Sequence, residues 1–539
     1  MSAPLLCVLF LWLAAVLAVG PSGNFPLSDD WAYAHAARSI CQDGPLDLLP
    51  WTGASLLFQA GYGALLCQLF GPSYEIFRAS TLLLGAAGMA LVFAAARRAG
   101  ASAAAAALAA AVVGSCPVYL NLSFTFMTDV PFAVFALLAA WAYIRGLEHQ
   151  ATTQLLLGAA AASASLLIRQ HGIFVAAAAS AAALLIPAQP MSQRLRLAIC
   201  AGMLPAVTLG AYVGWIATGH GPLAVQNKIS EATGVSLLEI GDAKFRALVT
   251  LGFFLLPWTV MLRPRDRLER IIVATSVVVL GLLALFLYLR DGSLMFYLTN
   301  VAYDLGVGSV TLRDAFFLAL DRLPRVGPLL GVPLTLVSIV SAALLLGRLA
   351  ATVRHVREPV PAFLLFAFAL TFAGSLLQSA YYFDRYLVPI VPLALLATLA
   401  AGSVARVSAT AVACTAAMAA FSVAGTHDWM EWNRARWKLL TALEQRGVPP
   451  TQIDGGMEYN AERLAARLRT APSDAQARPG QPSSVKSWWW VVDDRYVVAF
   501  GPLDGYRQID ARSYRRWLPP GRGHVLLLER ESVTGHRHP

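Results

Sequence analysis

Long apolar runs separated by short polar connections fill the first 424 residues of the chain, and this pattern stops after them. A helix needs about 20 mainly apolar residues to cross a membrane. Thirteen segments approximate this length, and we predict a transmembrane helix in each. They are 4–20, 76–96, 101–117, 130–147, 152–168, 172–187, 197–217, 248–262, 270–289, 326–347, 360–380, 386–402 and 405–424. The first lacks the basic flank and cleavage site of a signal peptide, so we expect it to stay uncleaved.

The composition agrees with a membrane protein that carries a separate polar part. Hydrophobic residues make up 57% of the chain and charged residues 13%, whereas soluble domains carry about 25% charged residues. Residues 425–539 hold 17 Lys and Arg and 13 Asp and Glu, which leaves 24 and 18 for residues 1–424. We therefore predict a transmembrane domain at 1–424 and a polar domain at 425–539. The net charge of +10 does not indicate nucleic acid, because Arg residues flank membrane spans.

The distribution of Arg predicts the orientation of the spans. With the N-terminus inside, the short inner loops hold 13 Arg, and RPRDRLER (263–270) is the strongest inside marker. The outer loops hold 11 Lys and Arg in a longer stretch of chain. Thirteen spans then leave residues 425–539 outside. Three long outer segments result, at 21–75, 218–247 and 291–325.

Local patterns predict structure outside the spans. In the first outer segment we expect interfacial helices at 29–41 and 54–70, with the aromatic side chains of Trp31, Trp51 and Tyr62 at the headgroup level. In the polar domain we expect a helix at 427–447, strands at 488–500 and 524–531, a turn at 453–456 and a flexible insertion at 473–484. This is a small α/β domain. The sequence DGGMEYN (454–460) suits either a glycan site or a turn and helix start, and we favour the turn.

The six cysteines are scattered and have no metal-binding spacing. We therefore predict neither a zinc site nor a disulfide framework. A Cys41–Cys67 bridge on the outer face is the less favoured alternative.

Acidic residues mark the outer ends of two predicted helices. Ser28-Asp29-Asp30-Trp31-Ala32-Tyr33 suits a helix start with Ser28 as N-cap and both aspartates in the first turn. Asp129 precedes the fourth span in the same manner. A second interpretation is functional, because Asp29 and Tyr33 share one helix face and Asp30 points about 100° away. Acids at one membrane depth, from segments far apart in sequence, favour a common cleft.

Cationic side chains are predicted at the same depth. Arg169 lies in a short outer turn with His171, which we expect to be packed or solvated, and Arg385 starts the twelfth span beside Asp384. Lys228 lies in the second long outer segment. A local ion pair or snorkelling explains Arg385 equally well. A guanidinium also suits a phosphate, since its fork binds two oxygens. Carboxylate and guanidinium groups beside lipid suit a hydroxyl nucleophile and a lipid-phosphate leaving group.

These motifs resemble those of GT-C glycosyltransferases that use polyprenyl-phosphate sugars, most closely the family 39 group of protein O-mannosyltransferases and lipid A aminoarabinose transferases. That group has an Asp-Glu-x-x-Tyr-like motif in its first outer loop, which here reads Asp29-Asp30-Trp31-Ala32-Tyr33. The second acid departs from the usual Glu. The family's later acid matches Asp129, and RYLVPIVPL (385–393) is similar to its Arg-Tyr-x-x-Pro segment.

The resemblance implies a GT-C-like polytopic membrane enzyme of the cell envelope, in a bacterial inner membrane with residues 425–539 extracytoplasmic. It implies sugar transfer from a polyprenyl phosphate to a hydroxyl of a lipid, glycan or protein on the outer face, with inversion. Asp29 is the expected base, and Asp30 and Asp129 are expected to hold the acceptor or tune Asp29. We expect substrate contacts from five further residues, namely Tyr33, Arg169, Lys228, Arg385 and Tyr386.

Three alternatives stay open at this stage. One is a transporter or flippase of a lipid-linked sugar with the same acids in proton coupling, although no repeat and no mid-membrane acids support it. Another is an inactive scaffold in which the acids only cap helices. No metal-binding cluster is evident, but a divalent ion on Asp29, Asp30 and Asp129 is a third option.

Overall fold

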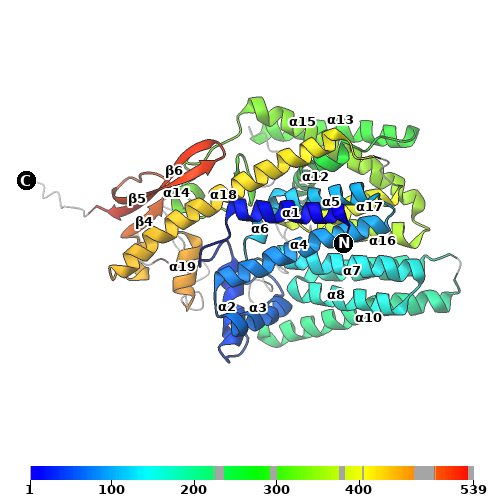
Figure 1. The fold of residues 1–539 in the computed structure, drawn as a ribbon, viewed down its shortest axis with the longest axis horizontal. Coiled ribbons are helices and arrows are strands. Elements are labelled where there is room, and N and C mark those ends of the chain that lie inside the picture. Colours follow the sequence, from blue (N-terminus) through cyan, green and yellow to red (C-terminus); the bar gives the residue numbers. More distant parts are fainter. Residues whose placement is uncertain are drawn as a thin grey trace, which may run out of the picture.

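The computed structural model is an elongated helical bundle with a small β-sheet at one end (Figure 1). The structure describes residues 2–187, 189–221, 225, 236–291, 300–374, 383–402, 406–466, 491 and 493–531. Each of the thirteen predicted segments overlaps a helix. In chain order these are α1 (Ala3–Val19), α4 (Tyr74–Arg98), α5 (Ala103–Ser115), α7 (Asp129–His149), α8 (Thr152–Ile168), α9 (Ile173–Leu184), α10 (Met191–Trp215), α12 (Leu237–Thr259), α13 (Arg267–Asp291), α15 (Pro328–Thr352), α16 (Pro359–Gly374), α17 (Ile390–Ala400) and α18 (Ala409–Gln445).

Several of these helices can cross a membrane. Within the described ranges, six are long and apolar enough to do so alone, and one bent pair would make a seventh. Five further apolar helices are shorter, among them α1, α8 and α16. The chain is therefore a multi-pass membrane protein with a helical fold, as predicted. The number of thirteen spans stays a prediction.

The bent pair consists of α5 and α6 (Pro117–Ser123), whose axes differ by 67°. Pro117 causes the break, because a proline disfavours helical geometry in the residue before it, and Cys116 is extended with φ −60° and ψ 126°. The predicted span at 101–117 thus ends at Ser115. The redirected chain brings residues 124–128 to the start of α7, which carries Asp129.

Helices α2 (Asp30–Cys41) and α3 (Leu57–Phe70) occupy the two ranges predicted as helical in the first outer segment, and Trp31, expected at the headgroups, is buried. A disulfide between Cys41 and Cys67 joins the two helices. The less favoured alternative is therefore the one present, because α2 packs against α3 and this brings two cysteines 26 residues apart in sequence to a Cα–Cα distance of 5.9 Å. Spacing along the sequence does not reveal such a contact.

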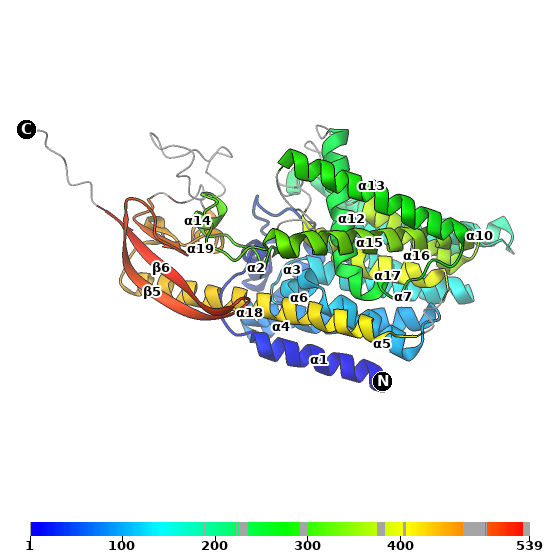
Figure 2. The same ribbon diagram turned by 90° about the horizontal axis from the view of Figure 1, so that it is seen from above.

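Residues 425–539, which we call the tail, are continuous with the bundle. Helix α18 runs through position 424 without a break and lies beside α1 (Figures 1 and 2). The guanidinium of Arg434 donates to the backbone carbonyls of Gly20 and Ser22, just beyond the end of α1. The tail therefore contacts the chain where it enters the first outer segment.

The tail contains a four-stranded sheet in the order β3-β4-β6-β5, with strands β3 (Ile453–Asp454), β4 (Tyr496–Ala499), β5 (Tyr506–Trp517) and β6 (Pro520–Arg530). Strand β5 was not predicted, because its many arginines hide the alternation of a strand. After β3 the chain turns at Gly455 and Gly456 and starts α19 (Met457–Leu464), so 454–460 forms the predicted turn and helix start. Asn460 stabilises the turn by donating to the carboxylate of Asp454. The predicted insertion at 473–484 lies outside the described residues.

Arg78 of α4 organises the loop between α1 and α2. Its side chain is 1% exposed, and its guanidinium donates to four backbone carbonyls. These belong to Pro21, Gly23, Phe25 and Phe124, at 2.6–3.1 Å. One buried cation thus fixes the path of the chain toward Asp29.

We expect Arg78→Met to destabilise the protein by about 3 kcal/mol, because it removes a charged donor and leaves the buried carbonyls without a hydrogen-bond partner. The measurement is the melting temperature of the detergent-purified protein. The exposed Arg522 offers the control Arg522→Met, which should melt like the wild type. Equal melting temperatures for the two variants would contradict this role of Arg78.

Candidate functional site

The first acid pair lies where the outer loop enters α2. Asp29 occupies the N-cap position and Ser28 precedes it in a left-handed conformation, with φ of 55°. Our prediction that Ser28 is the N-cap was therefore wrong. The side chain of Asp29 makes no capping hydrogen bond. The helix-capping interpretation therefore does not explain the direction of this carboxylate.

The carboxylate of Asp29 is turned toward two donors from other segments. It accepts a hydrogen bond from the indole N–H of Trp51 at 3.0 Å, and its other oxygen pairs with Arg385 at 3.0 Å. The side chains of Asp29 and Arg385 are 17% and 12% exposed. Each carboxylate oxygen retains a lone pair for a further donor. The partner of Arg385 thus lies 356 residues away in sequence, which excludes the local pair considered for it.

The second acid forms a comparable pair. Asp129 is the first residue of α7 and is fully buried, and one of its carboxylate oxygens binds the guanidinium of Arg169. Arg169 follows the last residue of α8. The other oxygen of Asp129 is buried and has no hydrogen-bond partner within the described ranges. A buried acceptor of this kind is suited to a donor from a ligand or water.

Two tyrosines connect the pairs into one cluster. The ring of Tyr386 lies 5.4 Å from the guanidinium carbon of Arg169 and 5.8 Å from that of Arg385. Tyr33 of α2 is buried, and burial raises the pKa of its phenol, with the charge of Asp29 adding to the effect. The charges of Arg385, Arg169 and Asp129 also act on this phenol. The predicted convergence of these distant acids and guanidiniums is therefore present in the structure.

Asp30 points elsewhere. Its carboxylate is 2% exposed and accepts the backbone N–H groups of Leu27 at 2.7 Å and Phe126 at 3.1 Å. Burial raises the pKa of Asp30 to about 8, and both of its oxygens are already engaged by these backbone N–H groups. This environment favours a role for Asp30 in holding the loops on which Asp29 and Asp129 stand.

Other predicted residues are arranged as follows. Asp384 accepts the backbone N–H groups of Val301 and Ala302, and this fixes the short 3-10 helix η5 (Asp384–Leu387) that carries Arg385. His171 packs between the rings of Phe132 and Phe174, which agrees with the packed alternative. Lys228 lies outside the described residues. Within the described ranges, no group of three or more His, Cys, Asp or Glu side chains is placed to hold a metal ion.

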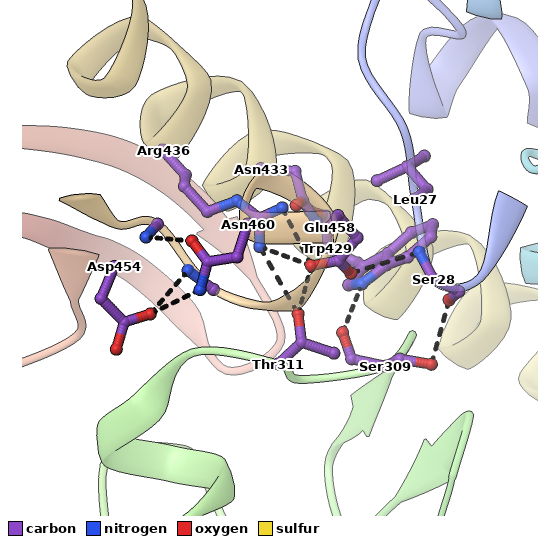
Figure 3. A network of polar contacts seen from close by, with 12 residues as sticks. Leu27, Ser28, Ser309, Thr311, Trp429, Asn433, Arg436, Asp454, Glu458 and Asn460 are labelled. Carbon is purple, nitrogen blue, oxygen red and sulfur yellow. Dashed lines mark hydrogen bonds and ion pairs between the residues drawn. The ribbon is translucent and has the colours of Figure 1, made fainter. Parts of the chain in front are cut away.

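Sequence reasoning missed the contribution of the tail. Glu458 of α19 is fully buried and accepts the backbone N–H of Ser28 at 3.2 Å, next to Asp29 (Figure 3). It also pairs with Arg436 of α18 at 3.0 Å. Nothing in the local pattern around Glu458 relates it to position 28. The hydrogen bond from Trp51 to Asp29 was likewise not predicted, because we expected the Trp51 side chain at the lipid headgroups.

Comparison with known proteins gives one family match. Residues 62–215 match the family model described as dolichyl-phosphate-mannose-protein mannosyltransferase. The family match supports the resemblance to GT-C glycosyltransferases. The matched segment includes Asp129 and Arg169 and ends before Arg385, and Asp29 precedes it. No curated protein matches the chain significantly.

Among solved structures, the chain is similar to ArnT from Cupriavidus metallidurans bound to undecaprenyl phosphate, at 15% identity and a TM-score of 0.40. The match covers 72% of this chain and 59% of that one. It is also similar to the archaeal oligosaccharyltransferase AglB from Archaeoglobus fulgidus in complex with an inhibitory peptide and a dolichol-phosphate. There the identity is 13%, the TM-score is 0.40, and the match covers 78% of this chain and 55% of that one. The chain thus spans less than two thirds of these structures.

We expect Asp129→Asn to destabilise the protein by about 3–5 kcal/mol, because it leaves the buried guanidinium of Arg169 without a counter-charge. The double variant Asp129→Leu with Arg169→Met replaces the whole pair by apolar groups and should recover most of the lost stability. Melting temperatures in detergent test both statements. If Asp129→Asn melted like the wild type, the ion pair would not be a buried one.

Proposed function

We propose that this protein is a membrane glycosyltransferase that moves a sugar from a polyprenyl-phosphate donor to a hydroxyl acceptor on the outer face of the membrane. The observation that carries the proposal is the pair of aspartate–arginine contacts, Asp29–Arg385 and Asp129–Arg169, joined by Tyr33 and Tyr386. The family match over 62–215 supports the same reaction class.

In the proposed reaction, the acceptor hydroxyl oxygen attacks the anomeric carbon of the sugar. The bond between that carbon and the phosphate oxygen breaks, and the polyprenyl phosphate leaves with the bonding electrons. The hydroxyl proton passes to the carboxylate of Asp29, which is the less buried of the two paired acids. A single displacement of this kind inverts the anomeric configuration. A positioned base of this kind contributes about 10²–10⁴-fold to the rate.

The arginines have the complementary role. As the glycosidic bond breaks, negative charge grows on the leaving phosphate, and guanidiniums stabilise it. Arg385 and Arg169 retain N–H groups beyond the single one that each uses on its aspartate, since a guanidinium has five. Asp129 has a buried oxygen left for the acceptor hydroxyl. Tyr33 and Tyr386 line the cluster. A contact of Lys228 with the sugar-donor substrate stays a prediction.

The placement in the cell is part of the proposal. The disulfide between α2 and α3 fits an oxidising compartment, which agrees with an external position for the first outer segment. The tail contacts that segment and would lie on the same side. We therefore place the site and the tail at the extracytoplasmic face of a bacterial inner membrane. A transporter gains no support, since Asp29 stands at the start of α2, next to the residue that α19 of the tail contacts.

Asp29→Asn should lower sugar transfer by about 10²–10⁴-fold, because asparagine has a similar shape and can still accept the hydrogen bond from Trp51 but cannot accept the hydroxyl proton. Transfer is measured in nanodiscs with a panel of radiolabelled polyprenyl-phosphate sugars and extracted envelope lipids, glycans and proteins as acceptors.

Asp47→Asn is the matched control. Asp47 lies in the same outer segment but pairs with His35 at 2.9 Å, so its replacement should leave transfer close to wild type. Full activity of a folded Asp29→Asn variant would rule out Asp29 as the base. Transfer by neither the wild type nor the control, with transport of the lipid-linked sugar instead, would refute the proposed function.

A further inference from the structure

Helix α19 of the tail presents two carboxylates to the segment that carries Asp29. Glu458 accepts the backbone N–H of Ser28, which immediately precedes Asp29 (Figure 3). Glu462 accepts from the guanidinium of Arg38 at 2.8 Å and from the phenol of Tyr74 at 2.6 Å. Arg38 lies in the last turn of α2. The tail thus contacts α2 at both of its ends.

The two glutamates act from one helix face, since residues four apart in a helix lie one above the other. Glu458 is itself held rigidly, because one of its oxygens accepts both terminal nitrogens of Arg436 at 3.0 Å and the hydroxyl of Thr311 at 2.5 Å. The side chains of Glu458 and Arg436 are completely buried. We call this set, Glu458 and Glu462 with Arg436, the α19 clamp.

The clamp acts at a conformationally unusual position. Ser28 has φ of 55°, a left-handed conformation that residues other than glycine seldom adopt. Such a conformation persists only where the surroundings hold it. The hydrogen bond that the Ser28 N–H donates to Glu458 holds it, together with the contact between the hydroxyls of Ser28 and Ser309 at 3.1 Å. The backbone conformation of Ser28 then determines the position of Asp29, the next residue.

A completely buried ion pair is weak evidence for stability, because apolar replacements of such pairs are often neutral or stabilising. Its position beside the base suggests another use. A change far from the reacting atoms that displaces a catalytic group by about 1 Å can reduce the rate by about 10²-fold. The clamp contacts the backbone N–H of Ser28, the residue immediately before Asp29.

We propose that Glu458 is a positioning residue and that the tail completes the active site by setting the place of Asp29 through the α19 clamp. The inference rests on the proposed function, since it assigns the tail a role in that reaction. It predicts that loss of the clamp lowers turnover through Asp29 and through no other group.

The test is a double-mutant cycle in full-length protein in nanodiscs, using the polyprenyl-phosphate sugar that gives the highest transfer rate in the panel. Rates are normalised to folded protein. Glu458→Gln should lower kcat by about 10²-fold and leave KM for the donor nearly unchanged. In the Asp29→Asn background, the same substitution should cause no further loss, because its effect passes through Asp29.

Two further variants keep the test decisive. If Glu458→Gln does not fold, Glu458→Gln with Arg436→Met replaces the pair by uncharged groups of similar volume and should fold with the same loss of kcat. Glu529→Gln is the matched control, because Glu529 also accepts two arginines within the tail, Arg495 and Arg507, but does not contact α2. It should leave kcat unchanged.

Hydrogen exchange supplies a readout that does not depend on activity. Peptides covering residues 24–37 should exchange faster in Glu458→Gln than in wild type or Glu529→Gln. Unchanged exchange, an unchanged kcat, or an equal loss in both backgrounds of the cycle would overturn the inference. If instead Asp29→Asn alone kept the full rate, the proposed function would be lost, which is a separate outcome.

Discussion

Two aspartate–arginine pairs bring four charges together from four distant parts of the chain. Removing such charges from water is costly, and their mutual attraction often does no more than offset that cost. A membrane protein could pack the same space with apolar side chains at no loss of stability. Stability alone therefore does not require the arrangement of Asp29, Arg385, Asp129 and Arg169, which agrees with the proposed role in chemistry. A proton acceptor beside a cation suits the departure of a phosphate from a sugar.

The surroundings of this cluster show how precisely its first residue is fixed. Arg78 fixes the chain before Asp29, and Asp30 ties the start of α2 to the loop before α7. The disulfide joins the end of α2 to α3, and Glu458 accepts from the peptide N–H just before Asp29. These restraints come from the bundle, the outer segment and the tail. Asp29 is thus pre-organised by three parts of the protein at once, which is what a positioned base requires.

The sequence contained enough information for the architecture and for part of the site. Apolar runs of sufficient length located the helices, and the acids and arginines at their ends identified the residues that meet. What it could not reveal depends on three-dimensional contact. The bond from Glu458 to Ser28 joins positions 430 residues apart, and the Cys41–Cys67 bridge depends on how α2 packs on α3. Strand β5 was not predicted because its own sequence alternates only weakly, and its pairing with β6 stabilises it as a strand.

The most direct measurement is an experimental structure of the full-length protein in nanodiscs with a polyprenyl phosphate added. The account predicts density for the phosphate within about 3 Å of the guanidinium of Arg385 or Arg169, on the side that faces Asp29. Phosphate bound elsewhere on the protein, with both arginines still engaged only by their aspartates, would contradict the account.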